Sequence, residues 1–188
     1  MKEGIKTSWD VLKFLIGVVI VAFLLKSFVF QPFVVEGISM EPSYHDKEYL
    51  IVNKIVYIVG KPERGDVMIF RPPDNPSVTY IKRVIGLPGD DVKISQGNVY
   101  INGQQLDEKY LPEGRQTLIG NEENLTLDKR LSDKEYFVMG DNRSHSTDSR
   151  EFGVVSKSEI VGKAWIVVYP KQYFGFAKHI VYNLQNSY

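Results

Sequence analysis

The chain has 188 residues with 23 basic and 23 acidic side chains, so its formal net charge is zero. A neutral chain without a basic field gives no reason to expect nucleic acid as a partner, and the absence of cysteine excludes disulfides, thiol catalysis and cysteine-ligated zinc. The length allows one or two small domains. The frequent aromatic, β-branched, glycine and proline residues favour a β-rich fold with many turns.

The segment 9–30 is predicted to be a helix that crosses a membrane. Its uninterrupted apolar part, 14–25, is by itself short enough to be a signal-peptide core or a buried helix. Extended over 9–30, the helix would be about 33 Å long, which matches the hydrocarbon core of a bilayer. The residues after it are bulky and offer no small-x-small cleavage site, so we expect an anchor that is not removed.

The lysines beside this segment indicate its direction. Before the apolar part stand Lys2, Lys6 and Lys13, and after it stands Lys26. Basic residues are retained on the cytoplasmic side of a membrane, so we expect the N-terminus inside and the body outside. The predicted division is a cytoplasmic end and anchor at 1–30 and an extracytoplasmic β-rich catalytic domain at 31–188.

The body of the chain is predicted to consist of short strands joined by turns. The apolar runs that predict these strands are 33–35, 49–52, 55–59, 66–70, 79–85, 92–95, 99–101, 136–139 and 160–169. Asn102-Gly103 directly after one of the runs predicts a tight hairpin. The polar stretch at about 96–134 predicts an inserted β subregion.

Ser39 is the first candidate for a reactive group. It lies nine residues after Phe30, in the run Gly37-Ile38-Ser39-Met40-Glu41-Pro42, where glycine and proline bend the chain. A fully extended chain would carry it at most roughly 30 Å beyond the anchor, so it would work near the membrane surface. A serine in such a run is usually a turn residue, so its role depends on a partner.

A Ser-His-Asp triad is the first arrangement that would activate Ser39. The chain has three histidines, His45, His145 and His179. His45 is so close to Ser39 in sequence that simultaneous contact is awkward, His145 fits a solvated loop, and His179 lies in the C-terminal tail. These positions favour ordinary roles for all three.

A metal site built from Asp141, His145 and Asp148 is the second arrangement. An EF-hand loop needs glycine at its sixth position, and this stretch has Ser146 there. The spacing therefore argues against a metal site.

A Ser-Lys dyad is the third arrangement. A lysine accepts a proton only when neutral, so its pKa must fall by roughly three units from about 10.4, which burial on an apolar strand can cause. Lys82 lies in such a run, 79–85, where alternation places it on one face with Val84 and places Arg83 on the other. Most strand lysines are solvated, so this pattern alone does not decide between the arrangements.

Four blocks of sequence occur in an order that matches a known family. They are Ser39-Met40-x-Pro42, Arg64-Gly65-Asp66-Val67, the run from Tyr80 to Asp90, and Gly140-Asp141-Asn142-Arg143 followed by Ser146-x-Asp148-Ser149-Arg150 and Gly153. The chain resembles the bacterial type I signal peptidases, or leader peptidases, of the peptidase S26 family. The resemblance includes the anchor and covers nearly the whole chain, and the single anchor with a small insertion is similar to the short Gram-positive form.

The resemblance implies roles for particular residues. Ser39 would be the nucleophile and Lys82 the general base. Asp148 and Arg150 would form a buried pair that holds the site together, and Ser146 would orient Lys82.

Asp141 and Arg143 would shape the same loop, and the backbone N–H of Ser39 would help to bind the oxyanion. The family uses neither a metal nor another cofactor. Gly37 stands where some members carry a serine whose hydroxyl helps to bind the oxyanion, so a second donor is expected elsewhere.

The resemblance also implies a fold and a function. The fold would be mostly β, a signal-peptidase and LexA-like coiled antiparallel β fold with one N-terminal transmembrane helix. The function would be that of a membrane-anchored serine endopeptidase, a single-pass type II protein of the bacterial cell membrane. It would contact lipid and cleave N-terminal signal peptides from secretory preproteins that carry small residues before the cut.

Two alternatives remain open. One is a related Ser-Lys maturation protease, and the other is a non-catalytic membrane-anchored paralogue. Retention of both Ser39 and Lys82 argues against the paralogue, and the anchor together with the block 140–150 argues against a soluble self-cleaving relative.

Overall fold

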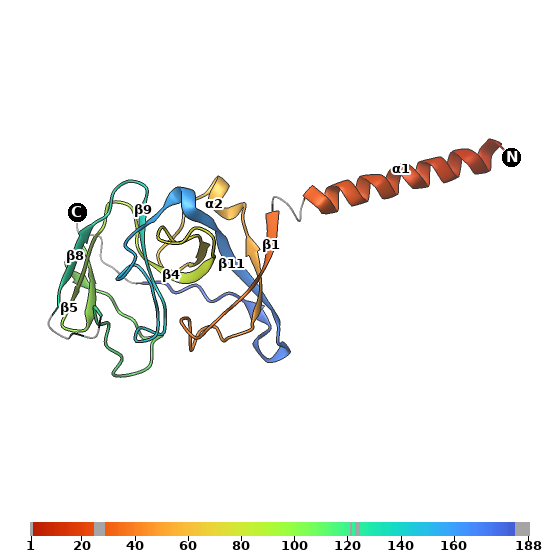
Figure 1. Cartoon of the computed structure of the whole chain (residues 1–188). Helices are drawn as coiled ribbons and strands as arrows, with labels where there is room; N and C mark the ends of the chain where they lie inside the picture. The colour runs from red at the N-terminus through yellow and green to blue at the C-terminus, as the bar shows by residue number, and fades with distance from the viewer. Residues whose placement is uncertain (1, 25–28, 121, 123–124, 183–188) are drawn as a thin grey trace.

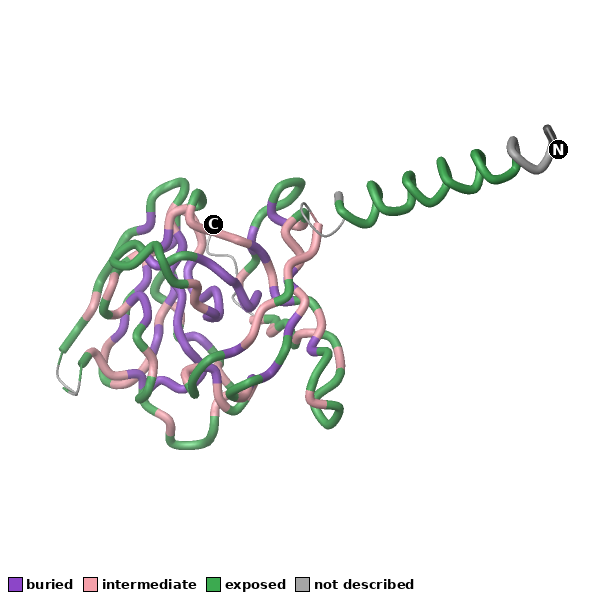
Figure 2. The backbone as a smooth tube through the Cα atoms, turned by 45° about the vertical axis from the view of Figure 1, so that its right-hand side comes forward, coloured by how far each residue is buried: buried purple, intermediate pink, exposed green. Residues whose placement is uncertain are grey.

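The computed structural model describes residues 2–24, 29–120, 122 and 125–182. The first element is an α-helix, α1 (Lys2–Leu24), which extends away from the β-rich body (Figure 1). Residues 7–23 of this helix are exposed (Figure 2). The predicted membrane segment 9–30 runs through residues 25–28, which lie outside the described residues. Within the described part of the chain, no helix has both the length and the apolar character that crossing a membrane requires.

The body is mostly β, which confirms the expected antiparallel β part of the fold class. Its larger sheet has the strand order β1-β2-β11-β3-β4-β9-β10, with β12 beside β11, and every pairing is antiparallel. The strands are β1 (Phe30–Val34), β2 (Tyr49–Asn53), β3 (Val67–Phe70), β4 (Tyr80–Gly86), β9 (Glu135–Met139), β10 (Val155–Ser156), β11 (Ile160–Tyr169) and β12 (Gly175–Phe176). Register shifts between β11 and its neighbours, and between β4 and β9, bend the strands, and the sheet curls around its core (Figure 1).

A second antiparallel sheet has the order β7-β6-β5-β8. Its strands are β5 (Asp91–Ser95), β6 (Asn98–Ile101), β7 (Gln104–Gln105) and β8 (Leu127–Arg130). Asn102 and Gly103 join β6 to β7 with φ angles of 52° and 79°, as a type I′ turn requires, so the predicted hairpin is confirmed. This sheet begins with β5, so it starts before the inserted β subregion that was predicted at about 96–134.

The strand predicted at 55–59 is wrong, because this run forms a single helical turn, α2 (Val56–Val59). The side chain of Asn53 at the end of β2 accepts a hydrogen bond from the backbone N–H of Val56 at 3.2 Å, which favours a turn over continued extension. Two short 3₁₀ helices, η2 (Lys157–Glu159) and η3 (Lys171–Tyr173), flank β11.

The core lies on both faces of β4. Ile81 packs in a cluster with residues of β2, β3 and β11, whereas Ile85 packs in a second cluster with residues of β5, β6 and β9. Val84 belongs to a third cluster between β3, β9 and β10. Strand β4, an interior strand of the larger sheet, is therefore buried from both sides, and a polar group on it is withdrawn from water.

Arg83 of β4 is buried completely and forms an ion pair with Asp141, which follows β9. Its Nε lies 2.9 Å from Asp141 Oδ1 and its Nη2 lies 2.7 Å from Oδ2, so the contact is bidentate. The guanidinium also donates to the carbonyl of Gly65 and to the carbonyl of Lys178. One side chain thus ties β4 to three other segments.

We expect Asp141→Ala to lower the free energy of unfolding by about 3–5 kcal/mol, because it leaves a buried guanidinium without its counter-charge. Asp91→Ala is the control, because it breaks the exposed ion pair with Arg130 and should lower stability by less than about 1 kcal/mol. Denaturant unfolding of both variants measures the difference. Equal losses would contradict the central role of the Arg83–Asp141 pair.

Candidate active site

Ser39 lies in the loop that joins β1 to β2. Met40 is fully buried and anchors the loop to the core, and the backbone N–H of Gly37 donates to Asp46 Oδ1 at 2.7 Å. Gly37 has a φ of 84°, a conformation that favours glycine. The loop therefore holds the Ser39 side chain half-buried at the surface of the domain.

Lys82 of β4 reaches this serine from the core. Its Nζ lies 2.8 Å from Ser39 Oγ, although the two residues are 43 positions apart in sequence. The ammonium also donates to the carbonyl of Ile81 at 3.0 Å. Only 4% of Lys82 is exposed, because β4 is covered on both faces.

Burial lowers the pKa of Lys82 to about 8. The carboxylates of Asp148 and Asp141 oppose this shift, and the charge of Arg150 adds to it. A lysine with this pKa is partly neutral in mildly alkaline water, and the neutral amine accepts a proton from a hydroxyl within hydrogen-bond reach.

Asp148 and Arg150 form a buried bidentate pair. Arg150 Nε lies 2.8 Å from Asp148 Oδ1, and Nη2 lies 2.8 Å from Oδ2. The hydroxyl of Ser146 donates to Asp148 Oδ2 at 2.8 Å. Within the described residues, the hydrogen bonds of Lys82 Nζ go to Ser39 and to the Ile81 carbonyl, so the structure does not bring Ser146 into hydrogen bonding with Lys82.

Arg143 joins the loop after β9 to the inserted region. It is almost completely buried, and its Nε donates to the carbonyl of Gly140 at 3.1 Å. Its other partners come from the inserted region: Glu108, Tyr110 and Thr117. Together with the Arg83–Asp141 pair, these bonds hold the loop on both sides.

The histidines are placed elsewhere. His45 Nδ1 lies 2.8 Å from Glu48 Oε1, and the exposed His145 contacts the hydroxyl of its neighbour Ser144. Within the described chain, which includes all three histidines, none is hydrogen-bonded to Ser39.

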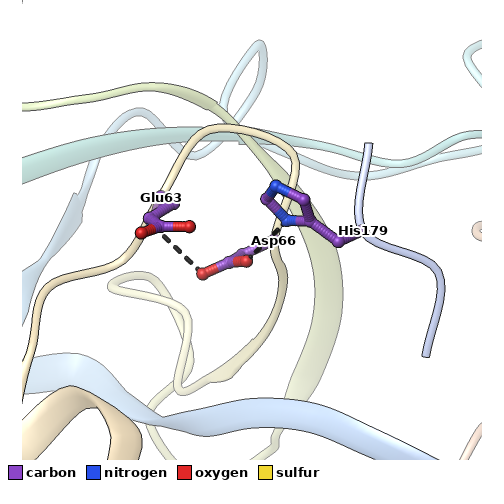
Figure 3. Close-up of side chains that lie close together, drawn as sticks. All are labelled: Glu63, Asp66 and His179. Carbon is purple, nitrogen blue, oxygen red and sulfur yellow. Dashed lines mark hydrogen bonds and ion pairs between the residues drawn. The ribbon is translucent and has the colours of Figure 1, made fainter. Parts of the chain in front are cut away.

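Glu63, Asp66 and His179 lie close enough together to suggest metal binding (Figure 3). The carboxylate of Asp66 is already engaged by His179 Nδ1 at 2.9 Å, by the Tyr57 hydroxyl at 2.9 Å and by the ammonium of Lys163. A cation here would compete with that ammonium. The cluster instead ties the C-terminal segment to the beginning of β3.

A cleft of about 510 Å³ opens beside Ser39 and Lys82. Its walls come from β1 and the residues just after it, from β4 and the segment leading into it, and from the loop after β9: Phe33, Val34, Glu36, Val78, Thr79, Tyr80, Ile81 and Thr147. Because β1 is the edge strand of the larger sheet, an extended peptide can lie along it. A cavity of about 600 Å³ in the inserted region contains neither Ser39 nor Lys82.

Gly140 is a site residue whose role was not read from the sequence. A Cβ atom on it would lie 2.5 Å from the carbonyl oxygen of Ser39 and 2.2 Å from Ser146 Oγ. No Cβ tolerates such contacts, so the loop after β9 approaches the serine loop this closely only with glycine. The motif Gly140-Asp141-Asn142-Arg143 was the available signal, but its reason lies in a contact across the fold.

We expect Gly140→Ala to lower the free energy of unfolding by about 1–3 kcal/mol, because the methyl group overpacks the contact with Ser39 and Ser146. Gly175→Ala is the matched control, since a Cβ there meets nothing within 4 Å. Thermal unfolding of both variants measures the effect. A Gly140→Ala variant as stable as the control would show that the two loops can separate freely.

The comparisons with known proteins agree on one family. A family model described as signal peptidase, peptidase S26, matches residues 8–169. A signal peptidase I of Bacillus licheniformis is 42% identical over 162 residues, covering 84% of this chain and 87% of that protein. Signal peptidase I S of Bacillus subtilis strain 168 is 40% identical over 163 residues, with the same coverage of both chains. A crystal structure of a signal peptidase I from Enterococcus faecalis V583 is 35% identical, covers 55% of this chain and 96% of its own, and has a TM-score of 0.47. On the family model and the two Bacillus relatives, the chain belongs to the signal peptidase family, peptidase S26.

Proposed function

We propose that the chain is a serine endopeptidase that removes signal peptides from exported preproteins, with Ser39 as nucleophile and Lys82 as general base. The observation that carries the proposal is the 2.8 Å contact between Ser39 Oγ and the buried Lys82 Nζ. The lowered pKa of Lys82 and the cleft beside it support the same roles. Membership of the family supports the reaction class, and the geometry of the site supports the roles of the two residues.

The reaction proceeds through an acyl-enzyme. Ser39 Oγ bonds to the scissile carbonyl carbon while its proton passes to neutral Lys82, and the carbonyl electrons move to the oxygen. Collapse of this tetrahedral intermediate breaks the scissile carbon–nitrogen bond, and the leaving amine of the mature protein takes the proton from Lys82. Water then bonds to the ester carbonyl carbon while its proton passes to neutral Lys82. Collapse of this second intermediate breaks the Oγ–carbon bond, the proton returns from Lys82 to Ser39 Oγ, and the signal peptide leaves as a free acid.

The developing oxyanion is held by the backbone N–H of Ser39. Gly37 has no hydroxyl to add, and its own N–H is already donated to Asp46. The direction in which the Ser39 N–H points therefore matters for the rate of acylation.

The substrate lies extended in the cleft, with β1 on one side and the segment before β4 on the other. The side chains of Phe33 and Ile81 line the same cleft as Ser39. Small residues before the cut fit this space, whereas bulky ones would collide with the walls.

The segment 9–30 anchors the enzyme in a bacterial membrane, with the N-terminus in the cytoplasm and the catalytic domain outside. Support comes from the exposed apolar side chains of α1 and from the aromatic contacts where β1 begins. Phe30 stacks on Trp165 with centroids 5.1 Å apart, and Trp165 lies 6.3 Å from Phe176. These rings offer the catalytic domain an apolar contact with lipid.

A related Ser-Lys maturation protease and a non-catalytic paralogue are the other candidates. A maturation protease would share the dyad and differ in its substrate, so a panel of preproteins separates it. A non-catalytic paralogue would cleave none of them.

Purified full-length protein in detergent should cleave a preprotein that has alanine at the first and third positions before the cut. Ser39→Ala should abolish cleavage, and Lys82→Ala should lower kcat by roughly 10²–10⁴-fold because the general base is lost. Lys93→Ala is the matched control, since Lys93 is an exposed lysine on β5. Cleavage by Ser39→Ala at the wild-type rate would refute the assignment.

The pH dependence should report Lys82. Below its pKa of about 8 the amine is protonated and cannot accept the serine proton, so kcat/KM should rise as pH increases through about 8. Initial rates measured between pH 5 and 10 test this. A midpoint near 6.5, the ordinary value for histidine, would indicate a different base.

A further inference from the structure

Asn142 holds two consecutive carbonyls of the serine loop. Its backbone N–H donates to the carbonyl oxygen of Ser39 at 3.0 Å, and its side-chain Nδ2 donates to the carbonyl oxygen of Ile38 at 3.2 Å. Asn142 is itself buried. The loop after β9 thus fixes the peptide groups on both sides of the Ser39 Cα.

The bond from Asn142 to Ile38 helps to determine where the Ser39 N–H points, together with the backbone N–H of Glu41, which donates to the same carbonyl oxygen at 3.1 Å. The Ile38–Ser39 peptide is planar, and in a trans peptide the carbonyl and the N–H point in opposite directions. Within the described residues, the Ser39 N–H has no hydrogen-bond acceptor. Holding the Ile38 carbonyl from one side therefore leaves the Ser39 N–H free and directed to the other side.

Arg115 fixes the orientation of the Asn142 side-chain amide. Its Nη1 donates to Asn142 Oδ1 at 2.6 Å and lies 3.3 Å from Ser144 Oγ. Because the amide oxygen accepts from Arg115, the amide nitrogen must face Ile38. Arg115 belongs to the inserted region, so this region contributes to the geometry of the serine loop.

We propose that Asn142 is a positioning residue for the oxyanion donor and that Arg115 acts through it. This inference rests on the proposed function. In the first step, the Ser39 Oγ–carbon bond forms, the proton moves to Lys82 and negative charge develops on the carbonyl oxygen. The aligned Ser39 N–H stabilises that charge, and the alignment matters more here because Gly37 supplies no hydroxyl.

Kinetics with a peptide substrate that has alanine at the first and third positions before the cut test the proposal. Asn142→Ala removes the side-chain bond to Ile38 but keeps the backbone bonds of Asn142 to Ser39 and of Glu41 to Ile38. It should lower kcat by roughly 10-fold with KM changed less than about 3-fold. Arg115→Ala should lower kcat by roughly 3- to 10-fold, and Arg115→Lys, which can still donate to Oδ1, should recover most of the loss.

Two matched controls come from the same inserted region. Asn98→Ala removes an asparagine that bonds within its own hairpin, and Arg130→Ala removes an arginine that forms an exposed pair with Asp91. Both should keep the wild-type kcat. The double variant Asn142→Ala/Arg115→Ala should be no slower than Asn142→Ala alone, because Arg115 acts through the amide.

Two further readouts separate positioning from a general loss of structure. A peptide aldehyde forms a tetrahedral adduct on Ser39, and Asn142→Ala should weaken its binding by about the factor lost in kcat/KM. The pH midpoint of kcat/KM should stay unchanged, because Lys82 is untouched. A shift of that midpoint, or a loss confined to KM, would overturn the proposal.

The outcomes distinguish this inference from the proposed function. If the wild type fails to cleave, the proposed function falls and the inference with it. If the wild type cleaves and Asn142→Ala has the wild-type kcat, only the inference falls. If Asn142→Ala does not fold, the comparison of Arg115→Ala with Arg115→Lys decides. Equal kcat values for these two variants and the wild type would overturn the inference.

Discussion

The buried ion pair between Arg83 and Asp141 is the interaction on which the rest of the structure depends. A guanidinium enclosed in the core must satisfy all its donors, and it does so with groups from four separate segments. These groups are Asp141, Gly65, Ser43 and Lys178. Arg83 directly follows Lys82 on β4, so the contacts that fix the arginine also fix the strand that carries the lysine.

The same arrangement explains the electrostatics of Lys82. Two carboxylates act on its ammonium, and both are engaged by an arginine: Asp141 by Arg83 and Asp148 by Arg150. Burial is the largest influence and lowers the pKa of Lys82, and the charge of Arg150 adds to that shift, so the two carboxylates do not reverse it. A site with negative charges close by can in this way still lower the pKa of its lysine.

The inserted region takes part in this scaffold. Arg143 and Arg115 connect it to the loop after β9, and that loop contacts the serine loop through Gly140 and Asn142. The segment between β7 and β8 therefore supports the loop after β9, and through it the loop that carries the serine.

Local patterns in the sequence were sufficient for much of the fold. Alternation and turn residues predicted the strands on either side of Lys82 and the hairpin at Asn102-Gly103, because these depend on neighbours a few residues away. The run 55–59 was misassigned, since its β-branched residues favour a strand while a hydrogen bond from Val56 to Asn53 starts a helical turn. Motif blocks, rather than composition, singled out Ser39 and Lys82 among the serines and lysines of the chain.

Residue types, their order and the short-range periodicity of the chain were enough to indicate a β-rich member of this family with a serine and a lysine as candidate partners. Whether Oγ and Nζ meet, why position 140 must be glycine and how Asn142 bonds to the peptide groups beside Ser39 were settled by packing between distant segments. The physical reason is that these contacts join residues 43 to 104 positions apart, and their geometry depends on the curl of the sheet and on where buried charges find partners.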